Sequence, residues 1–288
     1  MTNDEQRATP SDVGRVGELV LDYDRHGRET LLARSHCRSP WHLLPPIQLD
    51  DTGASYTLLV NPSGGLVGGD RLSVKARLGP GTHVLVSTPS ANRVYRSLSE
   101  PSVQTVELTV GSGAVLEWVP EVTIPFAGSR LHQRIHVTLA EGATLLLWDV
   151  LASGRIARGE RWAFTDLANE IRIETADGKV SLERVHLVPG DEPDWVGLAG
   201  DWNYVGSFYV VGDQIGAEVW KKLEDRMGLV LEEKGPAVLG GLSEPPVPGL
   251  LVKLVAKSAP ALTDTLEPLW SEVRSCLWNR PLPALRRS

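Results

Sequence analysis

From about Val16 onward, hydrophobic and polar residues alternate in short runs that are separated by glycine and proline. Three segments share one pattern, in which an alternating apolar run is followed by a tight turn that ends in glycine and by a second apolar run. These segments are Leu72–Thr88, Val106–Trp118 and Ile135–Trp148, with a weaker fourth copy at Ile171–Leu182. Glycine suits such corners because it reaches positive φ without a steric clash of Cβ. A repeat of about 30 residues made of strands alone predicts stacked β coils or layered hairpins. A generic β-sandwich whose hairpins merely resemble each other is the alternative.

The C-terminal third has a different pattern, which predicts two helices. Apolar residues recur four apart between Ile215 and Met227, Asp213 is a suitable N-cap, and Gly228 is suited to follow the last turn, so we expect a helix over 213–227. A second helix is expected over 263–278, where Pro268 should kink it or mark its start. Strands are expected at 237–241 and 250–256.

The predicted fold is therefore mostly β, a β-helix-like or layered stack of short strands with two α-helices in the C-terminal third. Residues 1–13 are polar and are expected to form a flexible tail. No clear linker interrupts the remainder, so 14–288 is expected to be a single domain. Its β body should cover about 16–210, with the helices appended.

Composition narrows the class of protein. The chain has 42% hydrophobic and 23% charged residues, which indicates a globular protein rather than a disordered one. A net charge of −7 argues against a nucleic-acid binder, which would carry a basic face. No apolar run reaches 18 residues and the first residues do not form a secretion signal, so we expect a cytoplasmic protein without membrane contact. Two distant cysteines, Cys37 and Cys276, exclude a disulfide scaffold.

Familiar catalytic motifs are missing. The glycine-rich stretch Asn61–Leu72 has neither the lysine of a phosphate-binding P-loop nor the spacing of a dinucleotide-binding loop, which favours two close turns. Asp70 is its one carboxylate, held between glycines and a strand. His132 and His136 are about 13 Å apart if they lie on a strand, too far for one metal ion. No stable metal cage and no activated nucleophile is recognisable, so we expect a binding protein rather than an enzyme.

The stretch Gly154–Trp162 carries unusually dense charge, with Arg155, Arg158, Glu160 and Arg161 between two glycines and a tryptophan. Two explanations of this charge have equal weight. The stretch can be a turn whose arginines pair with neighbouring carboxylates, or a surface that docks a partner or borders an ion path. Tryptophan and arginine dominate binding hot spots, although most of the nine tryptophans are expected in the core.

Five stretches, taken in order, resemble the urease accessory protein UreD (also called UreH) family. They are Asn61–Leu72 (NPSGGLVGGDRL), Thr88–Ser97 (TPSANRVYRS), Leu116–Pro120 (LEWVP), Gly154–Trp162 (GRIARGERW) and Leu250–Leu254 with Trp270, Val273 and Arg274. Each is weak alone, but together they are specific and span about residues 17 to 287.

The resemblance implies a β-helix-like body with two helices and a role in maturation. That role is delivery of nickel into apo-urease in a complex with UreF and UreG, with UreG supplying GTP hydrolysis. Nickel would be a transient cargo rather than a tightly bound cofactor, and it would move along an internal polar tunnel. The residues matched to its path are Asp70, Glu183 and Glu160. The candidates for partner docking are Arg71, Tyr95, Arg96, Arg155, Arg158 and Trp270.

Some positions depart from the family pattern. Val122 stands where relatives often have an acid, Asn92 and Arg93 replace a commoner Thr-Lys pair, and no tryptophan follows Arg287. These differences affect the exact ion path and part of the docking surface. Two other functions are kept open, a β-helical carbohydrate-active hydrolase and a structural binding module without metal.

Overall fold

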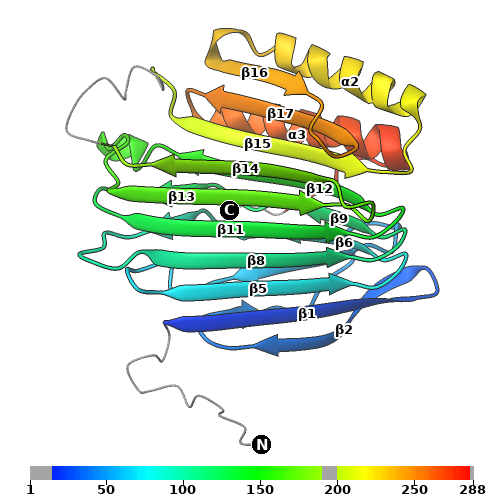
Figure 1. Cartoon of the computed structure of the whole chain (residues 1–288), viewed down its shortest axis with the longest axis horizontal. Helices are drawn as coiled ribbons and strands as arrows, with labels where there is room; N and C mark the ends of the chain where they lie inside the picture. Colours follow the sequence, from blue (N-terminus) through cyan, green and yellow to red (C-terminus); the bar gives the residue numbers. More distant parts are fainter. Residues whose placement is uncertain (1–14, 190–199, 286–288) are drawn as a thin grey trace, which may run out of the picture.

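The structure, a computed structural model, describes residues 15–189 and 200–285. Two sheets form its layers (Figure 1). The seven-stranded sheet has the order β14 (Val180–Leu187), β13 (Asp166–Glu174), β11 (Arg130–Leu139), β8 (Ser102–Val110), β5 (Arg71–Leu78), β1 (Val16–His26) and β2 (Glu29–Cys37). The main path of the ten-stranded sheet is β16 (Val238–Ser243), β17 (Gly249–Ala256), β15 (Tyr204–Gly212), β12 (Thr144–Ala152), β9 (Val115–Trp118), β6 (His83–Ser87), β4 (Ser55–Val60) and β3 (His42–Leu43). Beside it lie β7 (Asn92–Val94) and β10 (Thr123–Pro125).

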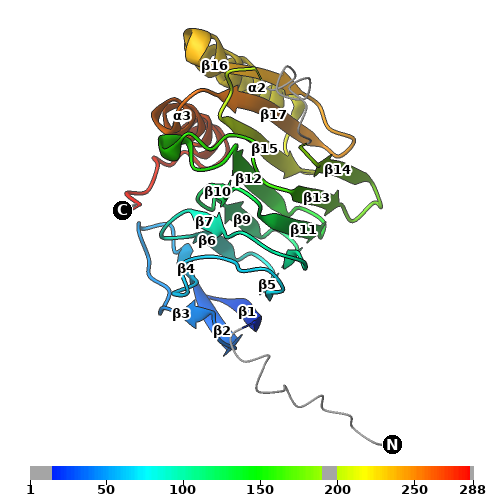
Figure 2. The same cartoon turned by 90° about the vertical axis from the view of Figure 1, so that its left-hand side faces the viewer.

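The three strong repeats are coils that pass from one sheet to the other. β5 leads into β6, β8 into β9 and β11 into β12, and each strand pairs in parallel with its counterpart in the next coil. The corner glycines Gly81, Gly113 and Gly142 have φ of 65°, 63° and 72°, where a side chain would add strain. The expected β-helix-like stack is thus confirmed. In Figure 2 the two layers lie side by side.

The weak fourth copy is different. Gly178 again has positive φ, at 80°, but β13 and β14 pair antiparallel within the same sheet. This segment is therefore a hairpin that ends the seven-stranded sheet rather than a fourth coil. The corner of the last true coil is capped by a side chain instead: the N–H of Gly142 donates to Asp213 Oδ1 at 2.9 Å, in place of the backbone carbonyl that a further coil supplies.

Two apolar cores hold the layers together. One lies between the sheets and includes Leu21, Val106 and Ile135. The other lies between the ten-stranded sheet and the helices α2 (Ala217–Glu232) and α3 (Ala259–Trp278). Burial of these apolar faces is the main source of stability. Short 3-10 turns at Ile156–Arg158 and Gly235–Ala237 complete the regular elements.

The helix bounds differ from those predicted. The residue before α2 is Gly216, while Asp213 caps the coil corner and Gly228 lies inside the helix. The apolar spacing was right, but a competing contact took the predicted cap. α3 begins four residues earlier than expected because the hydroxyl of Ser258 accepts the N–H of Ala261, and Pro268 lies within it. The strands predicted near 237–241 and 250–256 are β16 and β17.

The predicted tail at 1–13 lies outside the described residues, and the single-domain assignment stays a prediction. Within the described part of the chain, neither helix has the length and apolarity needed to cross a membrane.

Candidate functional site: a polar seam between the sheets

A row of amide side chains crosses the inner face of the seven-stranded sheet. Gln104, Gln133 and Asn169 are direct register partners on β8, β11 and β13. Gln104 accepts a hydrogen bond from Asn92 Nδ2 at 3.0 Å, and Gln133 Nε2 donates to Asn169 Oδ1 at 3.1 Å. Gln133 is buried, whereas Gln104 and Asn169 are part-buried. Because neighbouring inward positions such as Leu131 are apolar and buried, the row forms a polar seam between the sheets.

Asp149 reaches this seam from the opposite sheet, on β12. Its Oδ1 accepts from Gln133 Nε2 at 3.0 Å and its Oδ2 from Asn169 Nδ2 at 2.6 Å. Burial raises the pKa of the Asp149 carboxyl and the nearby charge of Glu183 raises it further, against the lowering effects of the two amide donors and of the Lys253 charge. The site therefore favours a proton, or another positive charge, at Asp149.

Glu183, on the edge strand β14, lies near the end of the same seam. Its Oε2 accepts from the hydroxyl of Tyr209 at 2.8 Å, its Oε1 accepts from Ser207 Oγ at 3.0 Å, and the ammonium of Lys253 forms an ion pair with Oε1. Burial and the Glu183 charge raise the pKa of Tyr209, so the phenol stays protonated and donates.

Two cavities lie along the seam. The first has a volume of about 80 Å³ and is bordered by Asn61, Gln104 and Trp118, among others. The second has a volume of about 60 Å³ and is bordered by Asn169, Glu183 and Ser207. Both are bordered by Thr123, Gln133 and Asp149, so Asp149 stands where they adjoin. Both volumes exceed the roughly 10–15 Å³ that one water needs, so each cavity has room for water.

The seam offers oxygen ligands, but few of them. Asp149 and Glu183 are the two carboxylates that border the second cavity, beside amide and hydroxyl oxygens. Among residues 15–189 and 200–285, no group of three or more His, Cys, Asp or Glu side chains converges in a way that could hold a metal ion. The arrangement suits a cation in passage better than one stored in a closed cage.

Of the three residues predicted for an ion path, only Glu183 borders a cavity. Asp70 instead closes the glycine-rich loop: its Oδ2 accepts the N–H of Val67 at 2.8 Å. Glu160 pairs with Arg155, whose Nε lies 2.7 Å from Oε2, and the N–H of Ala127 donates to Glu160 at 3.2 Å. Neither Asp70 nor Glu160 is among the residues that border the two cavities.

The residues predicted to dock a partner are spread over several environments. Arg71, Arg96 and Arg158 are exposed. Tyr95 packs edge-on against Phe126, with ring centroids 5.1 Å apart. The guanidinium of Arg155 lies 4.3 Å from the centre of the same Phe126 ring. Tyr95, Phe126 and Arg155 thus form a stacked group at the loop 154–162. A docking role for the predicted residues stays a prediction.

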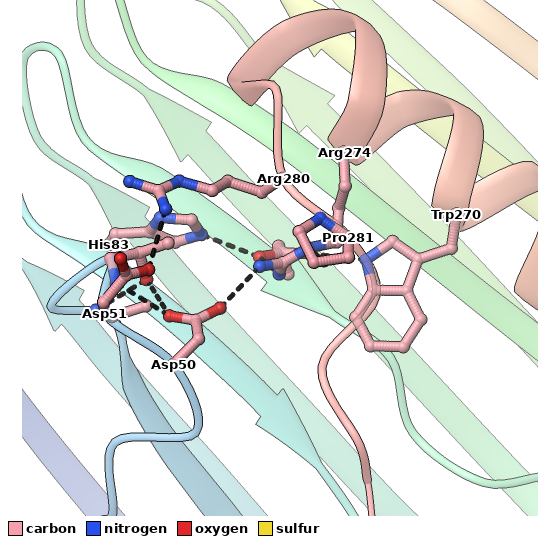
Figure 3. A network of polar contacts seen from close by, with 10 residues as sticks. Asp50, Asp51, His83, Trp270, Arg274, Arg280 and Pro281 are labelled. Atoms are coloured by element: carbon pink, nitrogen blue, oxygen red, sulfur yellow. Dashed lines mark hydrogen bonds and ion pairs between the residues drawn. The ribbon is translucent and has the colours of Figure 1, made fainter.

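Trp270, the sixth docking candidate, is 1% exposed and belongs to a buried network (Figure 3). Its indole N–H donates to Glu117, which also accepts from Arg274 Nη1 at 2.6 Å. His83 Nε2 lies 2.7 Å from the same carboxylate, and Arg274 Nη2 bonds Asp50 at 3.0 Å. In this fold Trp270 anchors α3 to the ten-stranded sheet and is not presented to a partner.

Sequence reasoning missed Asp149, Gln133, Asn169 and Lys253. One signal was present: Asp149 is the only charged residue in the otherwise apolar strand Thr144–Ala152, as Glu117 is in Val115–Trp118. A lone charge in a buried strand needs partners, which points to a polar site. The amides gave no such signal, because their meeting depends on the register of three strands.

Comparison with known proteins identifies the family. The model of the UreD urease accessory protein family matches residues 15–288. The chain belongs to the UreD family. The Urease accessory protein UreD of Deinococcus radiodurans is 35% identical over 97% of this chain and 98% of its own. The Urease accessory protein UreD 2 of Streptomyces griseus is 32% identical over 96% of both chains, and UreD of Haloarcula marismortui is 32% identical over 95% of this chain and 91% of its own.

The resemblance drawn from five short stretches is therefore confirmed over nearly the whole chain. A UreD protein is a urease accessory protein, and the family is one of maturation factors rather than of enzymes. The polar seam accordingly belongs to a urease accessory protein.

Proposed function

We propose that this UreD protein delivers nickel into apo-urease and that the ion passes through its interior along the polar seam. In this role it acts in the cytoplasm as a scaffold with UreF and UreG, and nickel is its transient cargo. One observation carries the path: two cavities between the sheets adjoin at Asp149, and Glu183 borders the second of them.

The chemistry of the seam fits a divalent cation in transit. Carboxylate, amide and hydroxyl oxygens can replace part of the hydration shell of nickel, while the absence of a thiolate or imidazole cluster from the cavity linings keeps binding weak. Asp149 is part-buried, and desolvation raises its pKa although the charge of Lys253 lowers it, so its negative charge is stabilised when a further cation lies beside it. A passing nickel ion supplies that charge.

Room in the cavities sets a further condition. The cavities are small, at about 80 and 60 Å³, so nickel exchanges some of its waters for protein oxygens while it passes.

The test is urease activation at limiting nickel with Asp149→Asn and Glu183→Gln. Both changes remove a charge with little change in shape. We expect each variant to copurify with UreF and UreG as the wild type does, while the rate of urease activation falls about tenfold or more. The control is Glu107→Gln, since Glu107 is exposed on β8. Normal activation by both seam variants would refute passage along the seam, and would leave the metal-free binding module as the function.

A further inference from the structure

Lys253 occupies the position on Glu183 that a metal ion would need. Its ammonium forms an ion pair with Glu183 Oε1 and donates to Ser207 Oγ at 2.8 Å. Ser207 and Lys253 are direct register partners on β15 and β17, whereas Glu183 comes from β14 in the other sheet. The ammonium therefore bridges the two sheets beside the second cavity.

The oxygen atoms of Glu183 are already engaged by donors. Oε2 accepts from Tyr209, and Oε1 receives both Ser207 Oγ and the ammonium. With a side chain only 15% exposed, Glu183 has little access to solvent for another ligand. A divalent cation can bind this carboxylate only if a donor leaves, and the ammonium is the one that carries a competing positive charge.

The side chain of Lys253 can move away from Glu183. Its side chain is 46% exposed, and lysine combines a compact charge with a flexible four-carbon stem. Tyr209 and Ser207, in contrast, are both buried on β15. Outward movement of the ammonium breaks the ion pair from its more exposed side, and it leaves a carboxylate held in place by the hydroxyls of Tyr209 and Ser207.

We propose that Lys253 is the counter-ion of Glu183 in the polar seam. Its ammonium prevents other divalent cations from binding this carboxylate and is displaced when nickel passes. This inference rests on the proposed function, because it assigns a regulator to the same path. Its physical content is competition: the ammonium and the metal ion bind one carboxylate and exclude each other. Lys253 thus lowers nickel affinity in order to allow release.

Equilibrium dialysis of the full chain against Ni²⁺ tests the competition directly. An opposite charge within a few ångströms shifts a carboxylate's affinity for a proton by about 1–3 pKa units, so Lys253→Met should tighten nickel binding by about tenfold or more. Lys253→Arg keeps the charge and should bind as the wild type does. The double variant Lys253→Met/Glu183→Gln should lose the gain, because the exposed ligand is then absent.

The control is Lys75→Met. Lys75 also pairs with one carboxylate, Glu18, at 3.4 Å, and its side chain is 48% exposed, close to the value for Lys253. Its partner Glu18 borders neither cavity, whereas Glu183 borders the second, so this change should leave nickel binding unaltered. No gain with Lys253→Met, an equal gain with Lys75→Met, or a gain that persists without Glu183 would each overturn the inference.

Failure of this inference can be told apart from failure of the proposed function. Dialysis measures competition at Glu183 whether or not nickel reaches urease. If Lys253→Met leaves binding unchanged while Glu183→Gln slows urease activation, the path stands and the counter-ion role falls. If Lys253→Met tightens binding while Asp149→Asn and Glu183→Gln activate urease normally, competition stands and the path falls.

Discussion

The carboxylate of Glu117 and the guanidinium of Arg274 form an ion pair in the interior, with 2.6 Å between Oε1 and Nη1. The two residues are 157 positions apart, and both side chains are at most 1% exposed. Because Glu117 lies on β9 and Arg274 near the end of α3, the pair fixes the C-terminal helix against the ten-stranded sheet. Trp270 adds a second link from the same helix.

Replacing Arg274 by Met should destabilise the protein strongly. It leaves Glu117 as a buried charge with Trp270 and His83 as its remaining partners, and breaking a buried pair from one side costs about 3–5 kcal/mol. The free energy of unfolding, measured by urea denaturation, checks this.

The double change Glu117→Met/Arg274→Met removes both charges and should recover part of the loss, because two apolar groups tolerate burial. The exposed pair between Arg280 and Asp51 serves as control, and Arg280→Ala should cost less than about 1 kcal/mol. Equal losses in the free energy of unfolding for Arg274→Met and Arg280→Ala would contradict the role given to the buried pair.

Two glycines with positive φ should respond very differently to alanine. At Gly113 a Cβ meets nothing within 4 Å, so only backbone strain of about 1–2 kcal/mol is expected. At Gly65, which has φ of 152°, a Cβ would lie 2.2 Å from the carbonyl oxygen of Arg93. Gly65→Ala should therefore cost clearly more, and thermal unfolding of the pair measures the difference. A smaller loss at Gly65 than at Gly113 would show that the loop at 61–72 adapts freely.

Asp70 should act through stability rather than through nickel transit. Asp70→Ala removes the acceptor of the Val67 N–H, and a lost hydrogen bond of this kind costs about 1–3 kcal/mol where burial leaves the donor unsatisfied. Any loss of urease activation should then be restored at low temperature, where more of the variant is folded. A defect that persists in fully folded Asp70→Ala protein would place Asp70 on the ion path after all.

The stability effect of Asp149 should depend on pH. Burial raises its pKa in the folded state above the unfolded value of about 3.9. The contribution of the Asp149 carboxyl to the free energy of unfolding is then fully present below about pH 3.9 and is lost as pH rises through the folded-state pKa. Asp149→Asn should therefore be more stable than the wild type at pH 8, with a difference that shrinks on acidification. Urea midpoints at pH 8 and pH 5 measure this, and a constant or reversed difference would contradict the raised pKa.

The repeating pattern of the sequence predicts much of the fold, because each coil is encoded locally. Alternation within β5, β8 and β11 and the glycine at each corner suffice to place three coils. The fourth copy was harder to interpret, since a hairpin and a coil share the same local pattern. Whether β14 folds back or crosses over depends on the strands that lie beside it in space, and a local pattern does not contain them.

The site was less predictable for a physical reason. Gln133 and Asn169 become neighbours only through the register of β11 and β13, and Asp149 joins them from the other sheet. Glu183 was found through resemblance alone. Asp70 was matched to the ion path by the same resemblance; its carboxylate accepts the Val67 N–H, and a place on the path stays a prediction.

Passage of nickel along the seam is tested most directly by following the ion itself. Complexes of UreF and UreG with wild-type protein, Asp149→Asn or Glu107→Gln are loaded with radioactive nickel and mixed with apo-urease in the presence of a chelator that removes free ions. We predict transfer of label by the wild type and Glu107→Gln, and transfer reduced about tenfold or more by Asp149→Asn in an intact complex. Equal transfer by all three would contradict the account.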